Sequence, residues 1–278
     1  MREPARLQQN RIRDMVSIVM PSYQQVAYLE EAVRSVLDQE GVTVELLVMD
    51  PGSSDGSREL LLELHKEYGE CLVLHFAPDR GQSDAVNRGM ALARGRVLGW
   101  LNSDDRLRPG ALAKVAPLLA RDEPAWLYSK ASLIDAQGAP VMSFIAHYKN
   151  WRGRRFSRLK LLTENFIPQQ GLFWNRALWD MAGGLDIDLH LDMDYDQWLR
   201  FARISDPIVL HEELADFRIH GAAKGSRQTG EQLDAAYATA CRHVGPLGIP
   251  GRLMLPVHRL LSLRTRMAYR WLKPREKM

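Results

Sequence analysis

The sequence has few cysteines and no long apolar segment. Its two cysteines, Cys71 and Cys241, lie far apart and show neither a metal-ligand nor a redox spacing. No apolar run reaches the roughly 18 residues that a membrane-spanning helix needs, and the chain start lacks the apolar stretch of a signal peptide. We therefore expect a cytoplasmic protein with unpaired thiols.

Two common nucleotide-binding fingerprints are also missing. The first predicted strand, Val16–Met20, is not followed by Gly-x-Gly-x-x-Gly, and the chain has no Gly-Lys-Ser/Thr phosphate loop. His211 lacks the second histidine of a zinc protease. These absences disfavour a dinucleotide-dependent oxidoreductase, a P-loop enzyme and a zinc protease.

Basic charge is concentrated near the C-terminus. From Arg252 onward, eight basic residues stand against a single acidic one, Glu276, although the formal net charge of the chain is only +3. The rest of the chain is therefore net acidic and shows no basic stripe interleaved with aromatic residues. This distribution argues against a nucleic-acid partner.

Apolar runs alternate with helical patterns in the first part of the chain. Strands are predicted at 16–20, 44–49, 72–76 and 97–101, with helices at 28–39, 57–68, 82–93 and 109–120. This alternation is typical of an α/β fold with a mainly parallel sheet covered by helices. Further on, strands at 126–134 and 141–145 are expected to pair as a hairpin, followed by a loop at 149–158.

Polar clusters follow these strands. Asn102, Asp104 and Asp105 come directly after the fourth strand, and Asp50 follows the second. Because ligands bind outside the carboxyl ends of parallel strands, one crevice could collect these side chains. Carboxylates there can hold a divalent cation; the alternative is that residues 102–105 only form a strand-to-helix turn.

Several motifs in this order resemble glycosyltransferase family 2, nucleotide-sugar enzymes of the GT-A fold. The resemblance runs from about Val16 to about Gly225. Its motifs are Val-Ser-Ile-Val-Met-Pro-Ser-Tyr-Gln-Gln from 16, Asp-Pro-Gly-Ser-Ser-Asp-Gly-Ser from 50, Asp-Arg-Gly-Gln from 79, Leu-Asn-Ser-Asp-Asp from 101 and Met-Asp-Tyr-Asp-Gln-Trp from 193.

The resemblance implies a nucleotide-sugar donor and a divalent metal, Mn²⁺ or Mg²⁺. Tyr23 would stack on the nucleobase, Asp50 would contact the base or ribose, and Asp104 would bind the metal. His220 could complete the metal shell or be an ordinary surface residue. The remaining expected donor-site residues are Pro21, Ser22, Asp79, Arg80, Gly81, Asn102, Asp105 and Arg218.

The same resemblance implies that Asp194 is the catalytic base. A single displacement at the anomeric carbon needs a carboxylate opposite the leaving group to accept the proton of the attacking hydroxyl. Asp192 and Asp196 are interpreted instead as acidic residues that favour a helix N-terminus. Two departures from the family pattern are Asn102, in place of the first metal-motif aspartate, and Met193, where glutamate is frequent.

We divide the chain into a lead-in at 1–14, a GT-A domain at 15–228 and a helical basic extension at 229–278. The expected function is inverting, metal-dependent transfer of a hexosyl or N-acetylhexosaminyl group to a saccharide or lipid-linked hydroxyl acceptor, in cell-surface polysaccharide or glycolipid assembly. The alternatives are a catalytically idle nucleotide-sugar-binding scaffold and a nucleotidyltransferase.

The extension has a helical pattern with one apolar and one basic stripe. Such a helix is typical of proteins on an anionic membrane surface, which would make the protein peripheral on the inner face of the membrane. The alternative is that the apolar stripe packs on the domain or on a second subunit in a homo-oligomer. The apolar stripe comprises Val257, Leu260, Leu261, Met267, Ala268 and Trp271, and the basic one Arg259, Arg266, Arg270 and Lys273.

Overall fold

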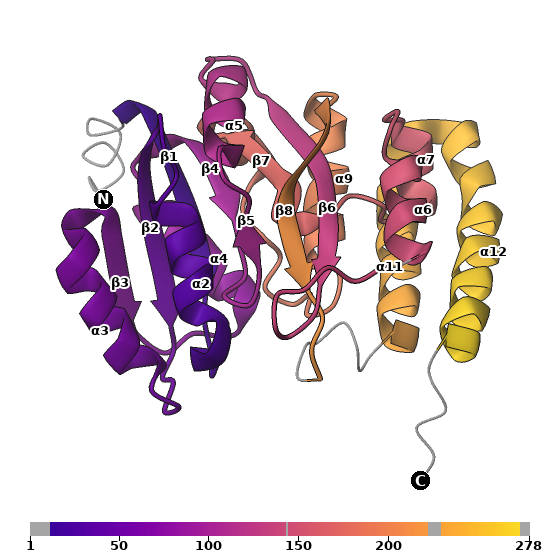
Figure 1. The fold of residues 1–278 in the computed structure, drawn as a ribbon. Helices are drawn as coiled ribbons and strands as arrows, with labels where there is room; N and C mark the ends of the chain where they lie inside the picture. The colour runs from indigo at the N-terminus through magenta and orange to yellow at the C-terminus, as the bar shows by residue number, and fades with distance from the viewer. Residues whose placement is uncertain (1–11, 143, 222–228, 273–278) are drawn as a thin grey trace, which may run out of the picture.

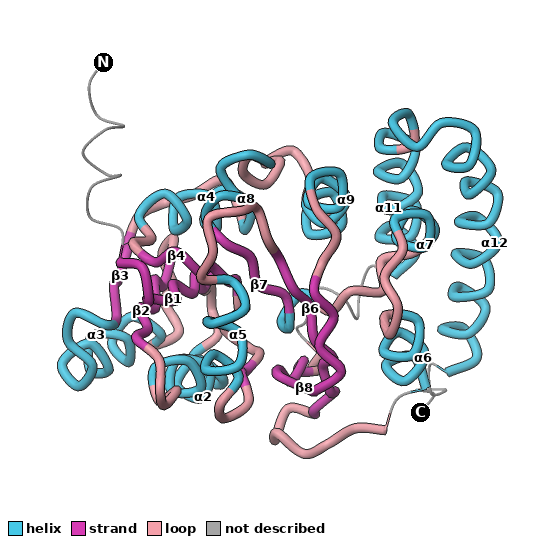
Figure 2. Tube along the Cα trace, turned by 90° about the horizontal axis from the view of Figure 1, so that it is seen from above, coloured by secondary structure: helices cyan, strands magenta, loops and turns pink. Residues whose placement is uncertain are grey.

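One mixed, mainly parallel sheet organises the molecule. The computed structural model describes residues 12–142, 144–221 and 229–272. Eight strands form the sheet in the order β3-β2-β1-β4-β7-β6-β8-β5, and helices cover both of its faces (Figure 1 and Figure 2). The predicted α/β architecture is confirmed.

The first half supplies the parallel part of the sheet. Strands β1, β2, β3 and β4 are parallel, with β1 paired to both β2 and β4. The strand order therefore reverses at β1, with β2 and β3 on one side and β4 on the other. Sheets of this kind bind ligands at the point where the strand order reverses. The elements are β1 (Ile12–Pro21), α2 (Val26–Leu37), β2 (Thr43–Asp50), α3 (Ser57–Tyr68), β3 (Leu72–Phe76), α4 (Gln82–Leu92), β4 (Gly95–Trp100), β5 (Arg106–Leu107) and α5 (Ala111–Leu119).

Side-chain periodicity explains why these segments pack on both faces. Val16 and Ile18 of β1 point into the apolar layer beneath α2, whereas Val19 belongs to the layer on the opposite face. Helix α2 buries Leu29 and Val33, four residues apart, against the sheet. A sheet covered on both faces requires the nearly continuous apolar strands of this sequence.

The second half differs from the prediction in several places. The expected strand at 141–145 is wrong: only Pro140 forms a bridge to Ile134, and a helix begins at Phe144. The expected loop at 149–158 is partly helical. The elements are β6 (Trp126–Ile134), α6 (Phe144–Arg152), α7 (Arg158–Thr163), β7 (Leu172–Asn175), α8 (Arg176–Ala182), α9 (Met193–Ile204) and β8 (Ile208–Arg218).

Strand β7 was not predicted, and it joins the two halves of the sheet. It runs antiparallel to both β4 and β6. Its last residue, Asn175, is fully buried, and the Asn175 Oδ1 atom accepts hydrogen bonds from the backbone N–H groups of Ala125 at 3.0 Å and Leu178 at 3.1 Å. One side chain thus caps α8 and fixes the start of β6.

The C-terminal helices pack on the side of the sheet that carries α9. Helix α11 (Thr229–His243) contacts α9, and α12 (Gly248–Leu272) contacts α7 and α11, which places α12 at the outer edge in Figure 2. Ala240 lies in the same apolar core as Trp198, so this segment shares the core of the preceding domain. The domain boundary at residue 228 stays a prediction.

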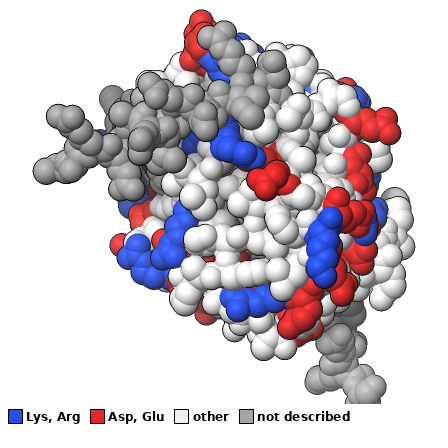
Figure 3. Space-filling model, turned by 90° about the vertical axis from the view of Figure 1, so that its left-hand side faces the viewer, with Lys and Arg blue, Asp and Glu red and all other residues white. Residues whose placement is uncertain are grey.

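Two surface properties bear on partners. In the described ranges, none of the helices is both long enough and apolar enough to cross a membrane. On the face that carries β3 and α3, the coloured part of Figure 3 shows basic and acidic side chains interspersed rather than a continuous basic surface. The expected absence of a nucleic-acid partner stays a prediction.

Candidate active site

The predicted donor-site residues gather at one edge of the sheet. Ser22 follows β1, Asp50 ends β2 and Asn102 follows β4. Backbone hydrogen bonds tie these strand ends together, from Ser22 N to Met49 O at 3.0 Å and from Leu101 N to Val19 O at 3.1 Å. The topology therefore brings these three strand ends together, as the sequence predicts.

Asp50 is buried at the end of β2 with one oxygen left unpaired. It is 1% exposed, and Asp50 Oδ1 accepts from the backbone N–H groups of Gly52 and Ser53, both at 2.8 Å, and from Arg58 Nε at 3.2 Å. The buried Asp50 Oδ2 and Ser22 Oγ atoms have no hydrogen-bond partner in the described residues. Leaving such groups unpaired costs about 1–3 kcal/mol each, so both atoms suit a ligand.

Tyr23 lies open to solvent beside these atoms. Its side chain is 60% exposed, so a face of the ring is free to stack. The following residue, Gln24, has φ of +56° and joins two loops: its N–H donates to Ser53 Oγ at 2.9 Å and its Nε2 to Ser54 Oγ at 3.1 Å. Pro21, half-buried at the end of β1, precedes this rigid turn.

Arg58 is a site residue that the sequence analysis missed. Its guanidinium lies 4.7 Å from the centre of the Phe76 ring while its Nε donates to Asp50. The contact joins the start of α3 to the end of β3. No motif marks Arg58, and only its position two residues into α3 could have suggested that it reaches back to Asp50.

The Asp79-Arg80-Gly81 segment forms a tight turn ahead of α4. Gly81 N donates to Asp79 Oδ1 at 2.8 Å, and Arg80 N donates to Asp84 Oδ2 at 3.0 Å. Gly81 has φ of +109°, a backbone conformation that favours glycine. The Arg80 side chain is 69% exposed and its nearest ion-pair contact, to Asp84, is a long 3.8 Å. It is thus free to reach an anionic ligand.

The two predicted metal ligands meet at the carboxyl end of β4. His220 Nε2 lies 3.0 Å from Asp104 Oδ2, and the His220 side chain is 5% exposed. Its ring packs on Tyr28, with centroids 4.7 Å apart. Across the described ranges no group of three or more His, Cys, Asp or Glu side chains could hold a metal. These two groups alone would leave other coordination positions for ligand oxygens.

Asp105 lies behind the crevice rather than in it. It is 1% exposed and accepts from Gln170 Nε2 at 2.9 Å, Arg218 N at 2.9 Å and Asn102 Nδ2 at 3.3 Å. Burial and the charge of Asp104 raise the pKa of Asp105 well above its usual range. The expectation that Asp105 contacts the donor does not fit this burial, and the geometry makes it a positioning residue for the turn.

Asn102 both accepts and donates hydrogen bonds, which an aspartate carboxylate could not do at this position. Its Oδ1 accepts from Gln82 Nε2 at 2.8 Å and Trp100 Nε1 at 3.0 Å, while its Nδ2 donates to Asp105 and to Gln169 Oε1, each at 3.3 Å. A carboxylate has no N–H to donate. The amide therefore avoids a third negative charge beside Asp105 and ties the turn together.

Arg218 also differs from its predicted role. It is 1% exposed, its Nε donates to Asp104 O at 2.8 Å, and its guanidinium pairs with Glu31. A further N–H donates to Asp135 O at 3.1 Å. A guanidinium buried in this way and bonded to protein groups does not fit the expected contact with the donor. Its contacts instead hold the Asp104 turn from behind.

Asp194 stands at the start of α9, separate from the metal pair. It is half-buried, and it accepts from Asn165 Nδ2 at 3.1 Å and from Tyr195 N at 2.7 Å. Burial raises the pKa of Asp194 above its ordinary value, against the opposing effect of these hydrogen bonds and of the Lys149 charge. A carboxylate whose proton affinity is increased in this way suits a general base.

The neighbouring aspartates have structural partners. Asp192 accepts from Thr239 Oγ1, and Asp196 Oδ1 lies 2.8 Å from His243 Nε2, both on α11. Burial acts to raise the pKa of Asp196, but the His243 hydrogen bond and the Arg200 charge lower it overall. Among the described side chains, Asp194 is the one of the three without a hydrogen bond to α11.

The sequence matches known glycosyltransferases. Residues 17–180 match glycosyl transferase family 2. An uncharacterized glycosyltransferase of Rickettsia typhi is 28% identical over 224 residues, which cover 78% of this chain and 67% of the relative. The hyaluronan synthase of Pasteurella multocida is 28% identical over 236 residues, which cover 84% of this chain but only 24% of that protein.

A solved structure shares the fold. The mannosyltransferase PcManGT of Pyrobaculum calidifontis, solved with GDP-Man and Mn²⁺, superposes with a TM-score of 0.66 at 17% identity, over 93% of this chain and 76% of that one. At this identity the likeness shows the GT-A fold alone. The family match covers more than half of the sequence, and we conclude that this chain belongs to glycosyl transferase family 2.

Proposed function

We propose that this chain is an inverting, metal-dependent glycosyltransferase that moves a hexosyl or N-acetylhexosaminyl group from a nucleoside diphosphate to a hydroxyl acceptor. One observation carries the proposal: the Asp104–His220 pair and Asp194 are separate groups with different surroundings. The Asp104–His220 pair has the ligand types that bind a divalent cation. Asp194, with its raised pKa, is suited to accept a proton.

Asp104 and His220 would hold the divalent ion. A carboxylate oxygen and an imidazole nitrogen 3.0 Å apart are ligand types that Mn²⁺ accepts, and the similarly folded PcManGT was solved with Mn²⁺. When bound, the metal neutralises the negative charge that develops on the leaving diphosphate. Arg80, exposed beside the crevice, could add a charge-assisted contact to the same phosphates.

The nucleoside would lie over Asp50, Ser22 and Tyr23. The unpaired Asp50 Oδ2 can accept an N–H of a base or a hydroxyl of ribose, and Ser22 Oγ can donate or accept beside it. The exposed Tyr23 ring offers a stacking face. Both uracil and guanine have an N–H that fits such an acceptor, so these residues are compatible with either base.

Asp194 would take the proton of the acceptor. The acceptor oxygen attacks the anomeric carbon, the bond from that carbon to the diphosphate oxygen breaks, and its electron pair leaves with the diphosphate. The hydroxyl proton passes to an Asp194 oxygen. Asn165, which donates to Asp194 Oδ2 at 3.1 Å, keeps the carboxylate oriented for this transfer. A single displacement of this kind inverts the anomeric centre.

Cell-surface polysaccharide or glycolipid assembly is the proposed setting, with a saccharide or lipid-linked acceptor. Its support is the similarity to a hyaluronan synthase together with the surface of α12. Within that helix, residues spaced to lie within about 80° of one another form an exposed apolar stripe. The exposed stripe consists of Ile249, Leu253, Leu260, Leu263 and Met267.

The charge around this stripe favours an anionic membrane surface over a second subunit. Helix α12 has no Asp or Glu, and the exposed Arg252 and Arg259 flank the stripe. Two copies facing each other would bring these like charges together. Arg264, 5.2 Å from the centre of the Tyr148 ring, links α12 to α6, where Trp151 is also exposed. Of the predicted stripe, Leu261 is half-buried, and the side chains of Ala268 and Trp271 are outside the described set.

The test is donor turnover by the full chain. UDP- and GDP-sugars are incubated with Mn²⁺ and with saccharide or lipid-linked acceptors, and release of nucleoside diphosphate is measured with and without EDTA. The proposal expects release that requires both the acceptor and the metal. Folded protein that binds a nucleotide sugar but transfers no sugar to any acceptor would support the idle scaffold instead.

A further inference from the structure

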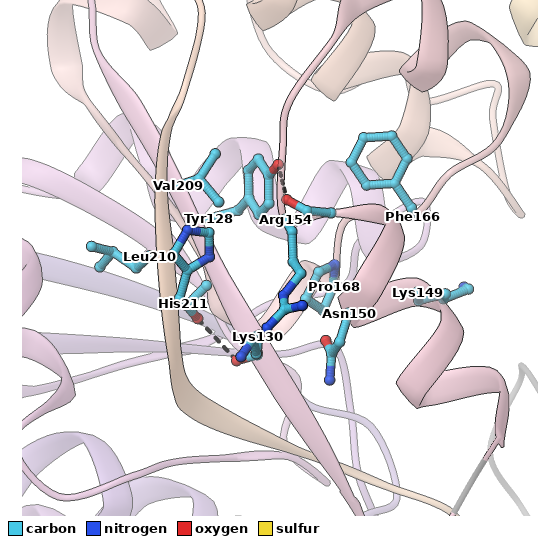
Figure 4. Close-up of a pocket in the computed structure, with 12 residues that line it drawn as sticks. Tyr128, Lys130, Lys149, Asn150, Arg154, Phe166, Pro168, Val209, Leu210 and His211 are labelled. Atoms are coloured by element: carbon cyan, nitrogen blue, oxygen red, sulfur yellow. Dashed lines mark hydrogen bonds between the residues drawn. The ribbon is translucent and has the colours of Figure 1, made fainter.

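A cleft lined by basic side chains lies between β6, β8 and α6. Its walls come from β6, the first residues of β8, α6 with the turn after it, and residues 166–168, and it is open to solvent. Figure 4 shows Lys130 of β6 and Arg154 of the turn directed into the space between these walls, with His211 of β8 beside them. The sequence analysis assigned none of these residues to a site.

The cleft is lined by three basic side chains and a histidine. Lys130, Lys149, Arg154 and His211 line it, and no lining residue is acidic. In the hydrogen bonds and ion pairs of the described residues, these four side chains have no partner. Lys130 and Arg154 have no carboxylate among these contacts, so a bound anion would relieve the repulsion between the two charges.

Nearby carboxylates are directed elsewhere. Glu213, two residues after His211, pairs with Arg108 at 2.9 Å, and the intervening Glu212 pairs with Lys114. Glu164, before the 166–168 wall, pairs with Arg152 at 3.1 Å. Three acids close in sequence to the cleft walls thus already bind other cations.

The walls are fixed by hydrogen bonds that do not involve the basic groups. Tyr128 Oη donates to Gly153 O at 2.6 Å, and Asn150 Nδ2 donates to Ala131 O at 3.2 Å, so α6 and its turn are attached to β6 at two points. A Cβ atom at Gly153 would lie 3.4 Å from the Tyr128 ring and 3.5 Å from Phe166. Arg154 is therefore presented from a tightly packed turn.

The cleft borders the proposed catalytic base. Lys149 lines the cleft, and its charge acts on Asp194 to lower the pKa of that carboxyl. Asn165, which donates to Asp194, directly precedes the wall residue Phe166. The donor's diphosphate has its own proposed site at Asp104 and His220. An anion in the cleft would therefore belong to the acceptor.

From this geometry we propose that the cleft binds an oxyanion of the acceptor, the carboxylate of an acidic sugar or a phosphate. This inference rests on the proposed function and narrows its acceptor to an anionic class. Arg154 supplies two parallel N–H groups that match either oxyanion, and Lys130 and His211 contribute further donors from the facing strands. Asn150 can accept from a hydroxyl next to the anionic group.

The experiment compares Arg154→Ala with Arg155→Ala, an exposed neighbour that does not line the cleft. Dissociation constants of glucuronate, glucose 6-phosphate and neutral glucose are measured on the full chain by titration NMR. We expect the wild type and Arg155→Ala to bind at least one anionic probe more tightly than glucose, and Arg154→Ala to bind it about tenfold more weakly. A second variant, Lys130→Met, should weaken the same probe.

The probes that bind identify the class of the acceptor. Glucuronate binding alone identifies an acidic sugar, and glucose 6-phosphate binding alone identifies a phosphate-bearing acceptor. Equal binding of glucose and both anions, or anion binding unchanged in Arg154→Ala and Lys130→Met, overturns the cleft proposal. Stabilisation by nucleotide and Mn²⁺, measured on the same proteins, reports the donor site independently. Its absence in the wild type would refute the proposed function while leaving the anion result to stand separately.

Discussion

His220 and Asp104 face each other across 116 residues of sequence, with Nε2 3.0 Å from Oδ2. Both partners are held from behind, His220 by the Tyr28 ring and the Asp104 turn by the buried Arg218. A ligand pair fixed before the metal arrives loses little conformational freedom when it binds. This preorganisation is the physical basis for a donor site at the end of β4.

Replacing the proposed base should separate chemistry from binding. Asp194→Asn keeps the shape and the Asn165 contact but cannot accept a proton, so we expect transfer to fall by about 10²–10⁴-fold with donor binding unchanged. Steady-state kinetics and nucleotide titration measure the two effects. Asp188→Asn, an exposed aspartate in the preceding loop, is the matched control. Transfer by Asp194→Asn at the rate of this control would remove Asp194 from the mechanism.

The pH profile should report the environment of Asp194. Because the base acts deprotonated and burial raises its pKa, the acidic limb of kcat/KM should rise with a midpoint above the ordinary carboxyl value of about 3.9. The Lys149 charge lowers this pKa, so Lys149→Met should move the midpoint to higher pH. Arg155→Met is the control for loss of an exposed charge. An identical limb in wild type and Lys149→Met would contradict the assignment.

The same raised pKa predicts a cost in stability at neutral pH. A carboxyl whose pKa is higher in the folded state stabilises the fold below its unfolded pKa, and this contribution is lost as the pH rises through the folded pKa. The free energy of unfolding of Asp194→Asn relative to wild type should therefore increase from pH 4 to pH 7, in addition to the pH-independent loss of one of the two hydrogen bonds that Asp194 accepts. Urea unfolding at both pH values measures it. A difference between the two proteins that is the same at pH 4 and at pH 7 would contradict the raised pKa.

The attachment of α11 to α9 should depend on His243. The His243→Ala variant loses the 2.8 Å contact to the buried Asp196, and we expect the free energy of unfolding to fall by about 1–3 kcal/mol. Since the pKa of Asp196 is lowered in the fold, its contribution is present above its unfolded pKa and is lost as the pH falls through the folded value. His190→Ala, at an exposed histidine, should be neutral. Equal stability of the two variants would exclude the predicted link.

Membrane binding should require the exposed stripe of α12. Leu253→Gln with Leu260→Gln changes two exposed leucines that do not belong to the buried core. We expect co-sedimentation with phosphatidylglycerol vesicles to weaken about tenfold or more. Leu62→Gln, at an exposed leucine of α3, serves as control. Wild-type protein that stays in the supernatant with anionic vesicles would contradict the membrane surface.

The parallel half of the fold could be predicted because its signals are local. Helix α3 and strand β3 have the predicted bounds, since apolar spacing and turn residues mark them directly. Strand β7 was missed because its four residues are buried in the sheet and followed at once by α8. Its role depends on pairing with β4, far away in sequence, which no local pattern reveals.

The sequence also predicted only some of the site residues. The resemblance to the family predicted Asp50, Asp104, His220 and Asp194 as site residues. The structure places Asp104 and His220 in contact. The side chain of Arg218 pairs with Glu31, 187 residues away, a contact that no local pattern reveals. Arg58 and the cleft residue Arg154 belong to no motif, so only the folded chain shows what they touch.

The most direct test of this account is nucleotide-dependent thermal stabilisation of the wild type and of Asp104→Ala, with and without Mn²⁺. A ligand at a hundred times its dissociation constant stabilises a protein by about 2.7 kcal/mol. We predict stabilisation by UDP or GDP and their sugars that requires Mn²⁺, persists in Asp188→Ala and is lost in Asp104→Ala. Folded wild-type protein that no nucleotide stabilises, or an Asp104→Ala variant that responds like wild type, would contradict the donor site at the end of β4.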